Sequence, residues 1–587
     1  MPVESNSLSD TADSPRSDAG TAASGSRAAF LPKTFTVLRG YAPAQFGGDL
    51  QAGLIVGIVA VPLALAFAIA SGVAPEKGLI TAAVAGFLIS FLGGSRVQIG
   101  GPTGAFVVIV AGIVQKHGFD GLVVCTLLAG VLLIAMGLAR LGGAIKFIPY
   151  PVVTGFTSGI ALIIFSSEIK DLLGLRMEAV PGPFLEKWAA FGRKIGTLSP
   201  SAVAISAATL AILLGWPRLS RRIPAPIVAI VATSAAAGLL HLPVETIASR
   251  FGTLPVGLPP PRWPAISAAS VTDLFPAAVT VALLASIESL LSAVVADGMI
   301  GSRHKSNVEL VGQGVANIAS ALFGGIPATG AIARTATNVK NGGRTPVAGM
   351  VHAATVLAIL LLFGRWVGLV PLATLAAILV VVAYHMSEWR SVVMLLRAPK
   401  SDVVVLAVTF LLTVLVDLTV AVQVGVVLAA FLFMRRMAEV TSVDAVAREF
   451  REAPDGTMLG DPEGVARRDV PEGVEVYEIN GPFFFGAAEK LKDVLSLVAR
   501  KPRVFILRMR NVPAIDATGI RVLDDLHDGL ARRGVTFLIA GLKEQPRLAL
   551  EKAGRLERYG RENFASDLDE ALERSRRILA AGRAAAR

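Results

Sequence analysis

Long apolar stretches separated by short polar connections run from about residue 49 to 435. From about residue 440 onward, polar and apolar residues alternate as in an ordinary soluble domain. A membrane helix needs about 20 apolar residues. The pattern predicts fourteen spans, near 50–71, 77–92, 103–115, 121–140, 149–170, 200–217, 224–241, 272–296, 307–323, 329–340, 346–364, 370–386, 402–416 and 418–434. The third and tenth spans are too short to cross a bilayer as helices alone. The predicted fold class is a mostly α membrane protein with a C-terminal α/β domain.

Two similar phrases interrupt the apolar pattern. "GGPTGAFVV" begins at Gly100 and "GGIPATGAIAR" begins at Gly324, and both contain Thr-Gly-Ala. If the fourteen spans divide into seven and seven, each phrase falls at the third span of its half. An odd number of spans per half gives the second half the opposite orientation, which predicts an inverted repeat with two half-helices.

The composition of these phrases suggests what they do. Gly and Pro interrupt helices, and extended backbone at membrane depth is tolerated only inside protein or beside a water-filled cavity. We expect a helix to begin near Thr103 and another near Thr329. Each helix start carries unpaired N–H groups and a partial positive charge, so two facing starts would form an anion site. The alternative is that the phrases only kink two packing helices.

Two ionisable residues lie near these phrases. Arg334 follows Thr329 by five residues, and Glu288 lies in the middle of the eighth span. Ionisable residues within a membrane are costly and are candidates for function. Arg334 could supply positive field to an anion while Glu288 carries a coupling proton or faces a cation such as sodium. The alternative is a structural Glu–Arg pair.

Charge and composition narrow the function further. The formal net charge is +11, but many of the basic residues lie in short loops between spans, where they orient a membrane protein with both termini in the cytoplasm. We therefore expect no nucleic-acid partner. Residues 1–30 lack the apolar core of a signal peptide and favour a disordered tail. The single cysteine, Cys125, lies in an apolar run and is expected to pack there. No nucleotide-binding motif is present, so we expect no ATP-driven transport, no enzyme activity, no cofactor and no metal.

Three segments carry a family resemblance: "VPLALAFAIASGVAP", "GGSRVQIGGPTGAFVV" and "GGIPATGAIARTATNVKNGG". They resemble the sulfate permease (SulP) family, bacterial relatives of the prestin and pendrin group. The resemblance implies core and gate subdomains, an elevator-like motion and a homodimer. It also implies a substrate site at Phe67, Thr103, Gly104, Ala105, Phe106, Ala328, Thr329, Gly330, Ala331 and Arg334, with Glu288 at the coupling-ion site.

One departure from the family pattern bears on the substrate. Several plant and animal members have Gln and Tyr in the first span, where this chain has Leu63 and Phe67. The site is therefore less polar on that side, and sulfate, bicarbonate and C4-dicarboxylates all stay open as substrates.

The C-terminal part has the pattern of an α/β domain. "GVEVYEI", "RVFILRMRNV" and "VTFLIAG" are predicted strands, and "AAEKLKDVLSLVAR" and "IDATGIRVLDDLHDGLARRG" are predicted helices. The order and the "AIDATGI" turn resemble a STAS domain. Ala517 occupies the position that is a phosphorylated Ser in anti-sigma-factor antagonists, so a role in dimer contacts or folding is favoured over signalling. "PFFFGAAE" is read as core or interface.

The sequence therefore predicts a cytoplasmic tail at 1–40, a transmembrane transport domain at 41–437 and a cytoplasmic STAS domain with its tail at 438–587. The leading hypothesis is a secondary-active anion transporter of the bacterial inner membrane, coupled to protons or sodium and surrounded by membrane lipid. A passive anion channel of the same fold is the second hypothesis. A membrane sensor that signals through the STAS domain is the third.

Overall fold

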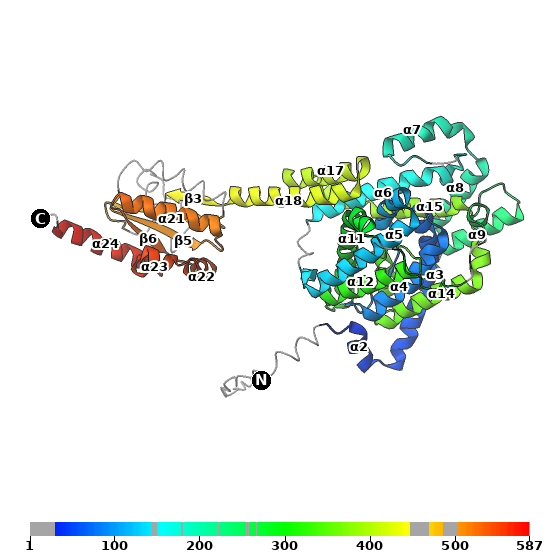
Figure 1. Ribbon diagram of the computed structural model, residues 1–587, viewed down its shortest axis with the longest axis horizontal. Helices are drawn as coiled ribbons and strands as arrows, with labels where there is room; N and C mark the ends of the chain where they lie inside the picture. Colours follow the sequence, from blue (N-terminus) through cyan, green and yellow to red (C-terminus); the bar gives the residue numbers. More distant parts are fainter. Residues whose placement is uncertain are drawn as a thin grey trace, which may run out of the picture. The chain divides into compact units, whose positions relative to one another are not determined.

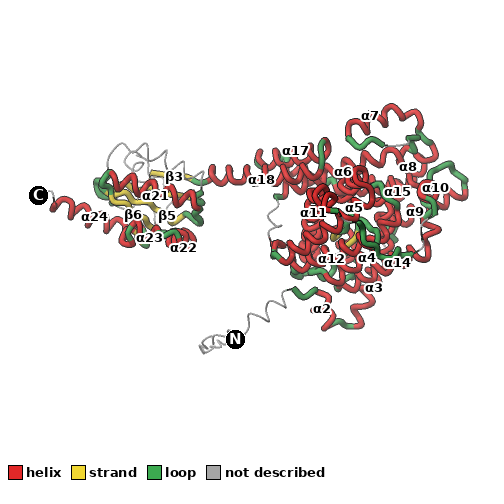
Figure 2. The backbone as a smooth tube through the Cα atoms, in the orientation of Figure 1, coloured by secondary structure: helices red, strands yellow, loops and turns green. Residues whose placement is uncertain are grey.

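The computed structural model describes residues 30–143, 149–177, 180–220, 223–253, 255, 257–265, 267–445, 469–484 and 502–585. Figures 1 and 2 show the elements of the chain. The chain divides into two compact units, Met1–Val427 and Leu428–Arg587. Most of the predicted N-terminal tail, residues 1–29, lies outside the described residues.

Helices make up nearly all of the first unit, and a helix covers each predicted span (Figure 1). The helices that correspond to spans are α3 (Pro43–Ala70), α4 (Pro75–Leu92), α5 (Val107–Leu138), α6 (Tyr150–Leu173), α8 (Pro200–Leu219), α9 (Ala225–Leu239), α11 (Ala268–Ile300), α12 (Ser306–Leu322), α13 (Ile332–Lys340), α14 (Pro346–Val367), α15 (Leu372–Met386), α17 (Lys400–Leu415) and α18 (Leu418–Val440). Shorter helices lie between them: α2 (Lys33–Val37), α7 (Phe184–Lys194), α10 (Ile247–Phe251) and α16 (Trp389–Leu395).

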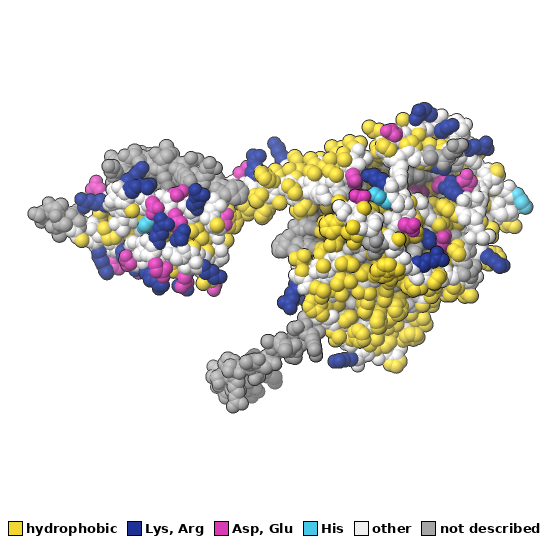
Figure 3. All heavy atoms as spheres, in the orientation of Figure 1, with side chains coloured by type: hydrophobic (Ala, Val, Ile, Leu, Met, Phe, Trp, Pro, Cys, Tyr) yellow, Lys and Arg dark blue, Asp and Glu magenta, His cyan; other side chains and the backbone are white. Residues whose placement is uncertain are grey.

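Within the described residues, nine helices are long and apolar enough to cross a membrane. Figure 3 shows hydrophobic side chains spread over much of the visible face of the first unit, as expected for a surface in lipid. The multi-span membrane character is therefore confirmed. The count of fourteen spans and the seven-plus-seven repeat stay predictions.

Helix α5 contains both the third and the fourth predicted span. Gly118, with φ 69° and ψ −174°, interrupts it and separates a short first half from a longer second half. A residue with a side chain rarely adopts this backbone conformation, so the glycine permits the bend. The third predicted span corresponds to the first half of α5 together with the 3-10 helix η2 (Gly104–Phe106), which begins close to the predicted start near Thr103. Cys125 lies buried in the second half.

The helices of the first unit pack in two groups. Helices α3, α4, α5, α11, α12, α13 and α14 form one group, in which α12 packs on α5 and α14 packs on α3 and α4. Helices α6, α8, α9, α15 and α17 form the other, in which α6 packs on α15 and α17. Helix α15 also packs on α3, so the two groups touch there. We call them the first and second helix groups.

A buried carboxylate of α3 fixes the start of α14 in the first helix group. Asp49 of α3 accepts hydrogen bonds from the backbone N–H groups of Arg344 and Thr345, at 2.8 and 3.2 Å, and from the Thr345 hydroxyl. Thr345 is the N-cap of α14, and its own side chain accepts from Val347. The N-terminal N–H groups that a helix leaves unpaired are thereby partly satisfied.

The second unit is built on a five-stranded sheet of order β3-β4-β5-β6-β7. Its strands are β3 (Ser442–Ala445), β4 (Val474–Asn480), β5 (Val504–Asn511), β6 (Thr536–Ala540) and β7 (Phe564–Ala565). Strand β3 pairs antiparallel with β4, and the other pairs are parallel. The three predicted strands are confirmed as β4, β5 and β6.

Helices lie on both faces of this sheet. One face packs Tyr477, Phe505 and Phe537 against α21 (Ala517–Arg532), α22 (Glu544–Lys552) and α23 (Arg555–Tyr559). The other face packs against α24 (Leu568–Ala585) through residues such as Leu572. This arrangement buries the continuous apolar strands on both sides, as parallel sheets require.

The predicted "AIDATGI" turn begins helix α21. Asp516 is the N-cap, and its side chain accepts from the backbone N–H of Gly519 at 2.8 Å. Of the three consecutive phenylalanines, Phe483 is fully buried in the core, as predicted, while Phe485 lies outside the described residues. The predicted helix "AAEKLKDVLSLVAR" also lies outside them.

Candidate functional site

The two matched phrases meet in space. Strand β1 (Gly100–Gly101) pairs antiparallel with β2 (Thr329–Gly330), with Gly100 opposite Gly330 and Gly101 opposite Thr329. All four residues are buried. Extended backbone inside an apolar unit leaves N–H and C=O groups to be satisfied, and pairing the two phrases satisfies part of that demand.

Each strand leads into a helix. A short 3-10 helix, η2 (Gly104–Phe106), begins directly after Thr103 and continues into α5. The second helix, α13, begins at Ile332, three residues later than the predicted start near Thr329. Thr329 and Gly330 are taken up by the strand pairing, so the helical turn cannot begin until the pairing ends. Arg334 is therefore the third residue of α13, inside its first turn.

Hydroxyl groups of α11 hold β2 in place. Ser289 and Thr329 share a hydrogen bond of 2.7 Å, and the Thr329 hydroxyl donates to the Ala285 carbonyl at 3.0 Å. The Gly330 N–H donates to the Ser289 hydroxyl at 3.1 Å. The Thr329 side chain is thus used to anchor the strand.

Polar side chains hold the segment before β1 in the same way. The Ile99 N–H donates to the Thr335 hydroxyl at 3.0 Å, and Asn338 donates to the Val97 carbonyl at 2.8 Å. Gln98 donates to the Ser289 carbonyl at 3.2 Å. We call the paired strands β1 and β2, with the helix starts that follow them, the crossing. Residues of α11 and α13 fix both strands, so the crossing is positioned by helices of the first helix group alone.

Glu288 is at the start of the first half-helix. Its side chain, on α11, accepts a hydrogen bond from the Thr103 hydroxyl at 2.9 Å. Thr103 is the residue that precedes η2, and it is 6% exposed. The carboxylate thus lies at the positive end of a helix, where a negative charge is stabilised.

Arg334 reaches across from the second half-helix to the first phrase. Its Nη2 donates to the Pro102 carbonyl, and its side chain is almost fully buried. Its Nη1 has no hydrogen-bond partner among the described residues. Within the same residues, no ion pair joins Arg334 to Glu288, so the structural Glu–Arg pair considered from the sequence is not formed in this structure, although the two charges interact electrostatically.

Two side chains flank the first half-helix at its start. A Cβ atom at Gly104 would lie 2.6 Å from the Met386 sulfur and 3.3 Å from Cε1 of Phe67. Phe67 comes from α3 and Met386 from the end of α15, which belongs to the second helix group. Gly104 therefore lies where the two helix groups meet. Ala105 and Phe106, the next residues, are buried.

Ala328 and Ala331 have different surroundings. The backbone N–H and C=O of Ala328 both bond to the Asn317 side chain of α12, at 2.8 and 2.9 Å. Its side chain packs with Ala85, Ile89 and Ala316, so it anchors the second phrase to α4 and α12. The Ala331 N–H donates to the Ile99 carbonyl at 2.8 Å and extends the contact between the two phrases.

His352 is the residue near the crossing that sequence reasoning missed. It lies fully buried on α14, and neither ring nitrogen has a hydrogen-bond partner among the described residues. Its ring lies beside Gly86, whose added Cβ would be 3.0 Å from the Gly100 carbonyl and 3.5 Å from His352 Cε1. A histidine in the middle of a span, like Glu288, could have been noted from the sequence as an intramembrane ionisable residue.

Models of known protein families match two regions of the chain. The Sulfate permease family model matches residues 46–409. The chain belongs to the sulfate permease family. The STAS domain model matches residues 466–571, at the end of the same chain.

Similar sulfate permease family proteins match along nearly their whole length. YvdB of Bacillus subtilis (strain 168), provisionally assigned as a sulfate transporter, is 43% identical over 535 residues, covering 91% of this chain and 98% of YvdB. The bicarbonate transporter BicA of Picosynechococcus sp. is 31% identical over 553 residues, covering 90% of this chain and 94% of BicA.

Solved structures support the same fold. The chain aligns with SLC26A9 with a TM-score of 0.83 over 97% of this chain and 98% of that one, at 18% identity. It aligns with the transmembrane domain of a cyanobacterial BicA with a TM-score of 0.60, at 30% identity, over 65% of this chain and 98% of that one. The predicted membership in the family with a C-terminal STAS domain is confirmed.

Proposed function

We propose that the chain is a secondary-active transporter of a small anion in the bacterial cytoplasmic membrane. The observation that carries the proposal is the buried meeting of the two phrases, where Arg334 from one half-helix reaches the backbone of the other. Helix starts and a guanidinium concentrate positive potential at one place, which is the chemistry an anion requires. Relatives named for sulfate and bicarbonate transport support the substrate class, and a C4-dicarboxylate is a third candidate. The naming of these relatives as transporters favours a transport role over an enzymatic one.

The proposed substrate site comprises Phe67, the first half-helix from Thr103 to Phe106, the second phrase from Ala328 to Ala331, and Arg334. Its position at the boundary of the two helix groups favours an elevator-like motion. The crossing is fixed to one group by α11 and α13, while Met386 of the other group approaches Gly104. A displacement of the first group relative to the second would carry the crossing with it and keep its hydrogen bonds intact. The seven-plus-seven inverted repeat fits this assignment, because β1 and β2 run in opposite directions.

Glu288 is the proposed coupling residue. Its carboxylate bonds to Thr103 at the edge of the site, and no guanidinium of the described residues is bonded to it. A carboxylate in this position can gain or lose a proton as its surroundings change during transport, or it can face a sodium ion. Both coupling ions stay open.

Uptake into liposomes tests this proposal. Purified protein in liposomes is assayed with labelled sulfate, bicarbonate, fumarate and succinate, with and without imposed proton and sodium gradients. We expect one of these anions to be concentrated by one gradient, and counterflow to occur when the inside is preloaded. Flux without counterflow would instead identify a passive channel. The absence of any anion flux in active preparations would contradict the function.

A variant separates coupling from binding. Glu288→Gln keeps an oxygen that can accept from Thr103 but cannot ionise. We expect it to lose gradient-driven accumulation and to retain anion exchange. Glu186→Gln, on helix α7, is the matched control and should behave like the parent. If Glu288→Gln still concentrates substrate in response to a proton gradient and the parent is independent of sodium, Glu288 is not the coupling residue.

The same proposal includes the domain organisation, the membrane orientation and the oligomeric state of the chain. The chain comprises a tail at 1–40, a transport domain at 41–437 and a STAS domain with its tail at 438–587. Both termini lie in the cytoplasm. Two copies of the chain form a homodimer. The STAS domain then serves contacts or folding. Its α21 begins with Ala517, which has no hydroxyl to phosphorylate.

A further inference from the structure

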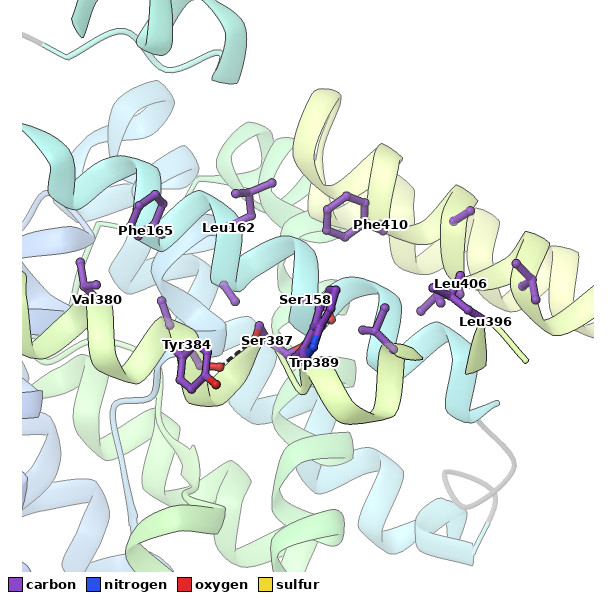
Figure 4. A pocket seen from close by; sticks show the side chains of 15 residues that line it. Ser158, Leu162, Phe165, Val380, Tyr384, Ser387, Trp389, Leu396, Leu406 and Phe410 are labelled. Atoms are coloured by element: carbon purple, nitrogen blue, oxygen red, sulfur yellow. Dashed lines mark hydrogen bonds between the residues drawn. The ribbon is translucent and has the colours of Figure 1, made fainter. Parts of the chain in front are cut away.

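A groove lies among helices α6, α15 and α17 of the second helix group and the short helix α16, outside the proposed anion site. Its volume is about 570 Å³. Figure 4 shows Phe165 and Leu162 of α6, Phe410 of α17, and Tyr384 and Trp389 along its length. We call it the α6–α17 groove. None of its lining residues belongs to the two phrases or to the residues that hold them.

The walls of the α6–α17 groove offer almost no polar group to a ligand. Of the fifteen lining residues, Ser158, Ser387, Tyr384 and Trp389 carry polar side-chain atoms. The Ser158 hydroxyl donates to the Ser387 carbonyl at 2.8 Å, and the Ser387 hydroxyl donates to the Tyr384 carbonyl at 2.7 Å. Because the serine hydroxyls donate to the backbone, the groove suits a hydrocarbon chain and disfavours a small anion.

Tyr384 and Trp389 lie midway along the groove, between Phe165 and Leu396 (Figure 4), and give this part the character of a membrane interface. Tyr384 is 70% exposed and Trp389 is 63% exposed, and exposed Tyr and Trp gather where hydrocarbon meets lipid headgroups. From Trp389 one arm of the groove extends along α6 from Ser158 to Phe165, about 10 Å at the rise of an α-helix. An acyl chain could therefore enter beside Trp389 and lie along α6 toward the membrane interior.

Three basic residues adjoin groove-lining residues in the chain: Arg390 follows Trp389, Arg397 follows Leu396, and Lys400 precedes Val403 by three residues. Arg390 of α16, Arg397 and Lys400, the first residue of α17, are all exposed. None of the three donates a side-chain hydrogen bond or forms an ion pair with any residue that the structure describes. Glu388 and Asp402 lie nearby in the sequence, and Asp402 accepts from Ser401. The three cations outnumber the two carboxylates and are free to bind a phosphate.

We propose that the α6–α17 groove binds an anionic phospholipid, with one acyl chain in the groove and the phosphate at Arg390, Arg397 and Lys400. Apolar walls, interfacial aromatics and exposed cations match, respectively, the tail, the glycerol region and the headgroup of such a lipid. A second copy of the chain fits less well. A twofold contact centred on these three cations would bring them against the same cations of the other copy, which like charges oppose. The proposal is independent of the substrate of transport.

Lipid retention by the full-length protein tests the proposal. The probes are palmitoyl-oleoyl phosphatidylglycerol and the matching phosphatidylcholine, added to protein purified in detergent. Native mass spectrometry counts bound lipid, and thermal unfolding measures the stabilisation that each lipid gives. We expect the parent to retain phosphatidylglycerol with about a tenfold preference over phosphatidylcholine, as several phosphate–cation contacts imply.

Two variants separate the headgroup contact from the groove. The triple variant Arg390→Gln, Arg397→Gln, Lys400→Gln should bind both lipids about equally. Its control is Arg193→Gln with Lys194→Gln, on helix α7, which should keep the preference. Ala161→Trp, in the groove, should reduce retention of both lipids at least fivefold, whereas Leu362→Trp, on the exposed face of α14, should not.

Three results would overturn the proposal. The first is a parent that shows no preference for phosphatidylglycerol. The second is a triple variant that keeps the preference. The third is a folded Ala161→Trp variant that retains lipid but becomes monomeric, which would assign the groove to contacts between copies. If Ala161→Trp fails to fold, the triple variant decides alone, because its three residues are exposed.

Discussion

Arg334 in the first unit and Asp524 in the second are both largely buried charges, but their surroundings differ. Asp524, with a side chain 14% exposed, accepts from Nη2 of Arg555 at 2.8 Å, from Tyr559 at 2.8 Å and from Arg558 at 3.3 Å. Arg334 donates to one carbonyl, that of Pro102, and its Nη1 has no partner among the described residues. Asp524 therefore has several hydrogen-bond partners within the protein, whereas Arg334 keeps a donor without a partner among the described residues.

The difference is the one expected between a structural charge and a charge that binds a ligand, the role proposed for Arg334. A buried charge with a full set of partners stabilises the fold, and removing it leaves those partners unpaired. A buried charge with spare donors costs stability, and a protein keeps such groups mainly at functional sites. Changes at the crossing should therefore affect transport, and changes at Asp524 should affect folding.

The largest expected effect is at the crossing itself. Gly104→Leu would push a side chain into the space beside Met386 and Phe67, and we expect uptake into liposomes to be abolished while the protein stays folded. Gly112→Leu, on the same α5, is the matched control, since no atom lies within 4 Å of a Cβ there. Normal uptake by purified Gly104→Leu would place the anion elsewhere.

The next largest effect is expected at Arg334, whose Nη1 has no hydrogen-bond partner among the described residues. Arg334→Ala removes a charge-assisted contact, so we expect the affinity for the transported anion to fall by about 1–3 kcal/mol. Arg334→Lys should recover part of the field without the bidentate geometry. Substrate titration of uptake gives the affinity, and thermal unfolding shows whether the fold is kept. Unchanged affinity in Arg334→Ala would make Arg334 a structural residue like Asp524.

The third effect belongs to the second unit. Asp524→Asn leaves Arg555 and Tyr559 with weaker bonds, and we expect the second unit to lose about 1–3 kcal/mol of stability. Hydrogen exchange of α21 in the full-length protein measures this loss. Anion selectivity should not change. If Asp524→Asn changes anion selectivity without lowering stability, Asp524 is not a purely structural charge, and the proposed difference from Arg334 is wrong.

The loss should depend on pH in a defined direction. Burial alone would raise the pKa of Asp524, but the bonds and charges of Arg555, Tyr559 and Arg558 outweigh it and lower the pKa. A carboxyl whose folded pKa lies below the unfolded value of about 4 stabilises above that value. Its contribution disappears as the pH falls through the folded pKa. The difference between the parent and Asp524→Asn should thus be full at pH 7 and shrink in acid.

A surface pair supplies the baseline for this measurement. Arg577 and Glu573 form an exposed pair one turn apart on α24. Exposed pairs of this kind contribute little because water screens them. Arg577→Ala should leave the hydrogen exchange of the second unit unchanged. A loss as large as that of Asp524→Asn would mean that burial and the number of partners do not govern these contributions.

The sequence predicted the helical elements and the strands because those features follow from local patterns, and it predicted that the two phrases face one another because their wording repeats. Apolar length gives spans, alternation gives strands, and Gly-Pro phrases exclude continuous helices. Arg334 and Glu288 were found because charges are rare at membrane depth. These signals depend on residues close together in the chain.

Features that depend on distant residues were not predictable. The sequence placed a helix start at Thr329, but pairing with Gly101, 228 positions away, holds that residue in a strand. Nothing local indicates that Ser289 would bond to Gly330 or that Met386 would approach Gly104. The role of Ala328 as an anchor to Asn317 likewise depends on the packing of two segments that only the fold brings together.

The crossing also limits how the transporter can acquire a new substrate. An added Cβ at Gly100 would lie 2.3 Å from Ile89, and one at Gly330 would lie 1.5 Å from Gln98. A side chain at Gly100 would therefore force Ile89 or the strand to move, and one at Gly330 would displace the Gln98 side chain that helps to hold β1. Phe67 and Met386, on the two sides of Gly104, are side chains that can change in size or polarity without breaking the backbone pairing. A library that diversifies these two positions while leaving the glycines fixed is the productive route to altered selectivity.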